Sequence, residues 1–306
     1  MLTSFFKNSK PINFLVLLVL LLVQYLAVQK IEVEGSQTWL NYLLPVVGFL
    51  GLVVAFLYLN AVVKTKAFAQ KNTYAVLIFV LGIICFYPIF NDHQALIAYG
   101  FWMIALRILF GMQDVQHFGK KLFDLSFFLV IAATFNPQLY VYLLFAYLSI
   151  LFFSPNQITH YFIPILACLA VWLIVLAISL LGYDDTRLLL WPEWTINFDW
   201  NNDLNFIFPL GLMGFLLLLG FFGLLAAIQK SQSSQKIYYR LVLLLLMFGG
   251  FIAVFQEQFL IQNFIYLFLP LVLMASIWVT QTKTKWKSES VLLFLTILGL
   301  AYNFFI

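Results

Sequence analysis

The sequence predicts an all-α fold: a polytopic integral membrane helical bundle of about eleven transmembrane helices in a single domain, residues 1–306. Apolar residues make up 64% of the chain and charged residues only 9%, whereas soluble proteins carry roughly 25% charged residues. The apolar residues form long runs, such as 15–28 and 215–228. Because these runs do not alternate between apolar and polar positions, they predict membrane-spanning helices and not a β-barrel.

Each predicted helix is an apolar run of roughly 20 residues bounded by short polar stretches. The first run follows Lys7 and Lys10 and has no small-residue cleavage site at its end, so we expect an uncleaved first span that sets the orientation. Helices are predicted near residues 12–29, 39–62, 73–90, 94–112, 122–135, 138–153, 161–182, 206–228, 238–255, 259–280 and 290–306, with an outer loop at 183–205.

The segment 122–153 is predicted to form two helices, broken at Asn136-Pro137. A single helix over this segment would be about 48 Å long, which is too long for one span. A single span would also move the basic residues that follow to the other side of the membrane. Each half is short, so the pair is either a re-entrant hairpin or two spans that meet below the outer surface. In both cases Asn136 needs protein or water partners.

Basic and acidic residues fall on opposite sides of this arrangement. Thirteen of the sixteen Lys and Arg residues lie in the segments on the N-terminal side of the membrane, and nine of the twelve Asp and Glu residues lie on the other side. Because cytoplasmic loops carry an excess of Lys and Arg, we expect a cytoplasmic N-terminus and a periplasmic C-terminus. The inner basic residues are Lys7, Lys10, Lys64, Lys66, Lys71, Lys120, Lys121, Lys230, Lys236, Arg240, Lys283, Lys285 and Lys287, and the outer acidic residues are Glu32, Glu34, Asp92, Asp184, Asp185, Glu193, Asp199, Asp203 and Glu257.

Arg107 lies within a predicted span, near its cytoplasmic end, and Asp124 lies at the start of the next helix at a similar depth. We expect the two side chains to form an ion pair that braces neighbouring helices. Two other interpretations stay open for Arg107: snorkelling to the inner interface, and contact with a substrate phosphate or ion. The neighbouring Lys120 and Lys121 suit anionic lipid headgroups or a polyprenyl phosphate, and they are equally typical of topology determinants.

The turn Asn91-Asp92-His93 places a carboxylate beside an imidazole on the outer side. Asp92 and His93 are candidate catalytic residues, since His titrates near neutral pH and such a pair suits general acid–base work. A tight turn also favours Asn and Asp for backbone reasons alone, so a structural role stays open. Glu257, at the outer end of a later helix, is the third catalytic candidate. We predict no metal site and no cofactor, because no ligand spacing typical of a metal occurs.

The outer loop 183–205 is the best candidate binding surface, since it combines acidic side chains with tryptophans. Aromatic rings beside acidic groups suit a sugar or a cationic group. Tryptophans also gather at bilayer interfaces, so an interfacial anchor is the competing interpretation. A separate outward-facing cavity is expected at the outer ends of two later helices. Together with Asn136, it would be lined by Gln256, Glu257, Gln258, Gln262 and Asn263. The candidate binding residues are Trp191, Glu193, Trp194, Asp199 and Trp200 in the loop, and Arg107, Asp124 and Asn136 within the helices.

Three ordered polar landmarks resemble those of a known family. They are an S-x-P-x-N start, an F-N…L-x-A…A-L-R helix and a K-x-F-D entry to the next helix, formed here by Ser9, Pro11 and Asn13, by Phe90, Asn91, Leu96, Ala98, Ala105, Leu106 and Arg107, and by Lys121, Phe123 and Asp124. Over roughly the first 180 residues the chain resembles a flavobacterial multipass membrane protein family of unknown function, domain-of-unknown-function family 6427. The resemblance implies a bacterial inner-membrane protein. The family has no established activity, so the resemblance implies none for this chain. At the entry to the seventh predicted span, members of the family have an Arg-Trp type pattern, and this chain has Thr159-His160-Tyr161 instead.

We expect the chain to act in cell-envelope biogenesis, handling a lipid-linked carbohydrate. The expected partners are membrane lipids, a polyprenyl-phosphate or glycolipid, and a protein of the envelope; no nucleic acid is expected. Two alternatives stay open: a non-catalytic subunit or scaffold of an envelope machine, and a small-molecule or lipid transporter. An enzyme here would be a lipid-linked sugar transferase with an outward-facing site. A short first outer loop, with only Glu32 and Glu34, weakens the enzyme interpretation.

Overall fold

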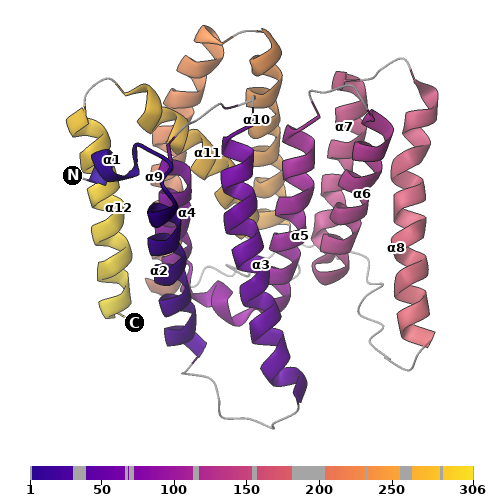
Figure 1. Cartoon of the computed structure of the whole chain (residues 1–306), viewed down its shortest axis with the longest axis horizontal. Helices are drawn as coiled ribbons and strands as arrows, with labels where there is room; N and C mark the ends of the chain where they lie inside the picture. The colour runs from indigo at the N-terminus through magenta and orange to yellow at the C-terminus, as the bar shows by residue number, and fades with distance from the viewer. Residues whose placement is uncertain are drawn as a thin grey trace.

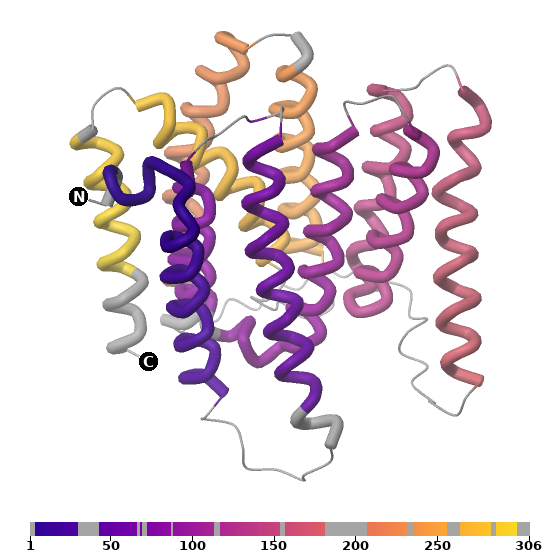
Figure 2. Tube along the Cα trace, viewed as in Figure 1, coloured from indigo at the N-terminus to yellow at the C-terminus, as the bar shows by residue number. Residues whose placement is uncertain are grey.

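A computed structural model describes residues 2–29, 39–65, 68, 72–112, 117–153, 157–180, 204–231, 233–255, 264–282 and 285–305. Every regular element in these ranges is a helix, so the prediction of an all-α fold is confirmed. Consecutive long helices run up and down through one bundle, as Figure 1 shows with labels and Figure 2 as a tube.

The described ranges contain twelve α-helices and three 3-10 helices. In chain order they are α1 (Leu2–Phe6), α2 (Pro11–Gln29), α3 (Trp39–Val63), α4 (Tyr74–Ile84), η1 (Tyr87–Asn91), α5 (His93–Phe110), α6 (Phe118–Phe135), η2 (Pro137–Tyr142), α7 (Leu143–Phe153), η3 (Ile158–Phe162), α8 (Ile163–Leu180), α9 (Leu204–Lys230), α10 (Ser233–Val254), α11 (Ile265–Gln281) and α12 (Lys285–Phe305).

Six of the described helical segments are long and apolar enough to cross a membrane, which identifies a membrane protein. Three further helical segments are apolar but shorter: Tyr74–Ile84, Pro137–Phe153 and Ile265–Gln281. The six long segments are Pro11–Gln29, Leu43–Val63, His93–Phe110, Ile158–Leu180, Ile207–Lys230 and Gln235–Val254.

Two of the shorter helices, α4 and α11, form the interior of the bundle. Every residue of α4 is buried, as are thirteen of the seventeen residues of α11. The two helices contact each other where the Phe268 ring lies against Gly82, in the space that a Cβ atom would need. By contrast, α8 stands at one edge of the bundle (Figure 1) and buries only four of its eighteen residues. A helix that is apolar on all sides is expected either in a protein core or against lipid, and this bundle contains both kinds.

Glycines bring two further helix pairs into close contact. A Cβ atom on Gly100 of α5 would lie 2.8 Å from the Gly51 carbonyl oxygen of α3. Gly220 and Gly223 of α9 face α11 in the same way, since Cβ atoms there would lie 2.6 Å and 2.5 Å from side-chain carbons of Met274 and Trp278. Small residues permit such close approach of helix backbones in membrane proteins.

Asn13, which ends the S-x-P-x-N motif, fixes the start of the chain to α4. Its buried amide donates hydrogen bonds to the carbonyl oxygens of Phe5 (3.0 Å) and Asn8 (2.9 Å). Thr73, which precedes α4, donates from its hydroxyl to the Phe6 carbonyl oxygen at 3.0 Å. The motif therefore has a structural role at the entry to α2.

Two of the predicted helices differ from the observed elements because of proline. The segment 73–90 was expected to be one helix, but α4 ends at Ile84 and the chain continues into η1, which contains Pro88. Proline lacks a donor N–H and disfavours a helical conformation in the residue before it. The segment 138–153 likewise begins as η2 at Pro137 and becomes α-helical only at Leu143.

Candidate functional site

The break between α6 and η2 lies at Asn136, where the sequence predicted it. The Asn136 side-chain oxygen accepts a hydrogen bond from the Gln138 backbone N–H at 3.3 Å, which caps the start of η2. Its amide nitrogen donates to the Tyr266 hydroxyl of α11 at 3.2 Å. Non-helical backbone inside a membrane protein needs protein or water partners, and Asn136 obtains protein partners on two elements.

Tyr266 belongs to a cluster of four fully buried aromatic side chains beside this break. We call Tyr99, Trp102, Tyr142 and Tyr266 the aromatic cluster; each of them is 0% exposed. The Trp102 ring is central, with ring centroids at 5.4 Å from Tyr99, 5.2 Å from Tyr142 and 5.5 Å from Tyr266. These rings come from α5, η2 and α11, so the cluster joins three segments that are far apart in the sequence.

Three polar atoms of the aromatic cluster have no hydrogen-bond partner within the described residues. They are the hydroxyls of Tyr99 and Tyr142 and the indole N–H of Trp102. The Tyr99 and Tyr266 rings also contact each other directly, with centroids 6.0 Å apart. Since buried polar groups in proteins are nearly always hydrogen-bonded, three such atoms in one place call for an explanation.

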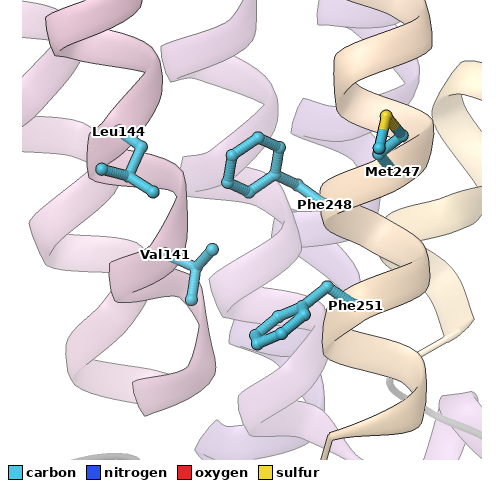
Figure 3. A pocket seen from close by; sticks show the side chains of 5 residues that line it. All are labelled: Val141, Leu144, Met247, Phe248 and Phe251. Carbon is cyan, nitrogen blue, oxygen red and sulfur yellow. The ribbon is translucent and has the colours of Figure 1, made fainter.

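A groove opens beside the aromatic cluster, between η2 and α7 on one side and α10 on the other (Figure 3). Its volume is about 510 Å³, and the described side chains that line it are all apolar. The outer part of the lining is open to the surroundings of the bundle: Met247 is 70% exposed and Leu144 is 51% exposed. The groove is lined by Val141, Leu144, Met247, Phe248 and Phe251.

Phe248 connects the groove to the aromatic cluster. It lines the groove, and its ring centroid lies 6.3 Å from that of Tyr142 and 5.0 Å from that of Phe145. Figure 3 shows this ring pointing across the groove toward Leu144 and Val141. A ligand in the groove would therefore contact a phenyl ring that itself packs against Tyr142.

Asp92 and His93, the candidate catalytic pair, both make structural contacts: one caps a helix and the other joins two helices. The Asp92 carboxylate accepts a hydrogen bond from the Ala95 backbone N–H at 2.9 Å and so caps α5. The Nδ1 atom of His93 lies 3.3 Å from the Tyr25 hydroxyl, which donates to the Pro45 carbonyl oxygen at 2.7 Å. Because that hydroxyl has one proton to donate, His93 serves as the donor from Nδ1. This geometry supports a structural role for both residues at the junction of α2, α3 and α5.

Arg107 and Asp124 lie half-buried on the adjacent helices α5 and α6, but no ion pair joins them within the described part of the chain. The Arg107 guanidinium instead lies over Gly111, the residue that ends α5, at 2.8 Å from the position of a Cβ atom there. The Lys121 ammonium donates to the Gly111 carbonyl oxygen at 3.4 Å. Two cations at a helix C-terminus are stabilised by the helix dipole. The side chain of Arg107 thus extends toward the end of its own helix, as snorkelling requires.

The remaining candidate residues lie outside the described residues. These are Trp191, Glu193, Trp194, Asp199 and Trp200 of the outer loop, and Glu257. Among the residues that the structure describes, no group of three His, Cys, Asp or Glu side chains could hold a metal ion.

Of the predicted site residues, the structure brings Asn136 to the aromatic cluster. The sequence analysis missed Tyr99, Trp102, Tyr142 and Tyr266. Aromatic residues make up 19% of the chain, so four of them carry no signal by themselves. Tyr99 and Trp102 are three residues apart and share one helix face, but only the fold shows that this face meets the break at Asn136.

A family model described as "Family of unknown function (DUF6427)" matches residues 1–306. The match covers the whole chain and so extends beyond the first 180 residues that carry the polar landmarks. No curated protein and no solved structure matches the chain.

Proposed function

The chain belongs to the family of unknown function DUF6427, and we propose that it is a bacterial inner-membrane protein of cell-envelope biogenesis that binds a lipid-linked carbohydrate. The groove between α7 and α10 would hold the hydrocarbon chain of that lipid. The observation that carries the proposal is the position of the groove: its described lining is apolar, its outer residues are exposed, and its Phe248 ring packs against Tyr142 of the aromatic cluster.

The size and lining of the groove support a long apolar ligand. Its volume of about 510 Å³ falls within the roughly 300–1,000 Å³ of small-molecule sites. A ligand with no polar chain atoms fits a wall built of Val, Leu, Met and Phe, since none of these side chains can hydrogen-bond. The exposed positions of Met247 and Leu144 support a groove mouth on the lipid-facing side, through which a lipid chain would enter sideways from the bilayer.

The proposal includes eleven membrane crossings with a cytoplasmic N-terminus and a periplasmic C-terminus. The alternating direction of consecutive helices (Figure 1) supports this topology. The excess of Lys and Arg in the segments on the N-terminal side supports the orientation. In this orientation Asn136 and the Asn91-Asp92-His93 turn lie toward the periplasm, on the same side as the outer loop 183–205.

Binding without catalysis is the version that the geometry favours. Asp92 caps its own helix, and His93 donates to Tyr25 of α2, so both side chains of this pair are committed to structural contacts. A role as a non-catalytic binding subunit of an envelope machine follows if a protein partner copurifies in equal amount. A transporter would instead carry the bound lipid between leaflets, and reconstituted vesicles would show movement of that lipid.

Native mass spectrometry of the full chain, extracted gently from its own membrane, tests the proposal. We expect a carbohydrate-bearing lipid bound in a one-to-one ratio. Met247→Trp fills the groove mouth and should lower that occupancy several-fold. Leu218→Trp is the matched control, because Leu218 of α9 is 62% exposed and lies outside the groove. Equal lipid occupancy in both variants, or only bulk phospholipid in the wild type, would overturn the proposal.

A further inference from the structure

The three buried polar atoms of the aromatic cluster are not explained by a lipid chain in the groove. We propose that the cluster is a binding site for a neutral hydroxyl group, supplied either by an internal water molecule or by the carbohydrate of the bound lipid. The second source rests on the proposed function, whereas the first does not. The site comprises Tyr99, Trp102, Tyr142, Tyr266 and Asn136.

The donors and acceptors of the site match a hydroxyl group. The phenols of Tyr99 and Tyr142 each offer one donor and one acceptor, and the indole of Trp102 offers one donor. None of these groups has a partner within the described residues. The Tyr266 hydroxyl accepts from Asn136 and retains its own proton to donate. A buried water typically makes two to four hydrogen bonds, and these groups provide that number.

The charge of the site favours a neutral ligand over a phosphate. The four side chains of the aromatic cluster and Asn136 are all uncharged, so the site itself offers no cation to a phosphate. An ionised ligand buried among aromatic rings without a counter-charge would also be strongly disfavoured. A hydroxyl has neither problem.

The backbone at the site also favours a polar occupant. The chain leaves α6 at Phe135, becomes extended at Asn136 and continues as the 3-10 helix η2, which carries Tyr142. Irregular backbone within a membrane occurs where it is buried in protein or lines a water-filled space. The helix break thus brings the Tyr142 ring against the Trp102 ring of α5, and Phe248 of the groove packs against the same tyrosine.

Radiolytic hydroxyl-radical footprinting of the full chain in lipid nanodiscs tests the water source. Radicals formed from a bound water oxidise the side chains that touch it. We expect Trp102 and Tyr142 to be oxidised several-fold faster than Phe56, when each rate is divided by its rate in the unfolded chain. Phe56 is a matched control because it is only 1% exposed and has no polar atom.

Tyr142→Phe, analysed by native mass spectrometry, tests the carbohydrate source. We expect this variant to lose the carbohydrate-bearing lipid while it retains lipids with the same chain and no sugar. Loss of all lipid would count against the inference and leave the groove as the site of both interactions. If Trp102 and Tyr142 are as protected as Phe56 and Tyr142→Phe retains the same lipids as the wild type, the inference is overturned. Fast oxidation without any bound carbohydrate would support the water source even if the proposed function fails.

Discussion

Removal of the Asn136 side chain should destabilise the bundle by about 1–3 kcal/mol, since buried hydrogen bonds contribute roughly 0.5–1.5 kcal/mol each and a stranded partner adds to the loss. Asn136→Ala deletes the bond from its amide to Tyr266 and the bond that it accepts from the Gln138 N–H. The Tyr266 hydroxyl, which is fully buried, would then join the three unpartnered polar atoms of the aromatic cluster.

A double-mutant cycle isolates the Asn136–Tyr266 contact. Tyr266→Phe removes the acceptor but leaves the ring packing, so the two single variants and the double variant should give a coupling of about 0.6 kcal/mol, the average measured for such contacts in a membrane protein, and at most about 1.7 kcal/mol. Reversible unfolding in mixed micelles, followed by the fluorescence of the eight tryptophans, provides the free energies. Thr296→Val is the control and should change little, because the half-buried Thr296 makes an exposed hydrogen bond only to its own helix, α12.

A coupling near zero would refute this reasoning, because the two side chains would then not meet in the folded protein. An increase in stability for Asn136→Ala would refute it more strongly. It would mean that the Asn136 side chain destabilises the folded protein and makes no favourable contact at the helix break.

Three further predictions concern other contacts. Gly100→Leu should lower the free energy of unfolding by about 1–3 kcal/mol, as overpacking does, because the new side chain would meet the Gly51 carbonyl oxygen. Gly250 faces open space, so Gly250→Leu is the control and should change the free energy of unfolding far less. His93→Ala should weaken the packing of α2 on α5 by about 1 kcal/mol, because it removes the hydrogen bond to the Tyr25 hydroxyl. Backbone amides of α2 should then be less protected from hydrogen exchange, and unchanged protection would argue against a structural role for His93. Arg107→Gln should reduce retention of anionic phospholipid in native mass spectra, and equal retention would confine Arg107 to capping its own helix.

The class of fold follows from the sequence because apolar run length and composition leave few alternatives to membrane helices. The break at Asn136 also followed from length, since one helix across residues 122–153 does not fit a bilayer. The end of α4 at Ile84 was harder to predict from the sequence, because the chain remains apolar to Phe90. Only Pro88, which restricts the backbone of the residue before it, indicates that the α-helix ends.

The candidate site depended on tertiary contacts that the sequence does not encode locally. Arg107 and Asp124 have similar estimated depths on adjacent helices, but depth does not fix the direction in which each side chain points, and Arg107 extends over Gly111 instead. The aromatic cluster combines residues 99, 102, 142 and 266, so no window of sequence contains it. The unpaired polar atoms of Tyr99, Trp102 and Tyr142 can be recognised only from the fold, which shows that no neighbour within the described ranges forms a hydrogen bond with them.

Photo-crosslinking in native membranes tests lipid binding in the groove most directly. A photoreactive residue would replace Met247, at the groove mouth, and in a second variant would replace Leu218, on the lipid-facing side of α9. We predict a carbohydrate-bearing lipid attached at position 247 and ordinary phospholipid attached at position 218. The same phospholipids at both positions would contradict a specific lipid site between α7 and α10.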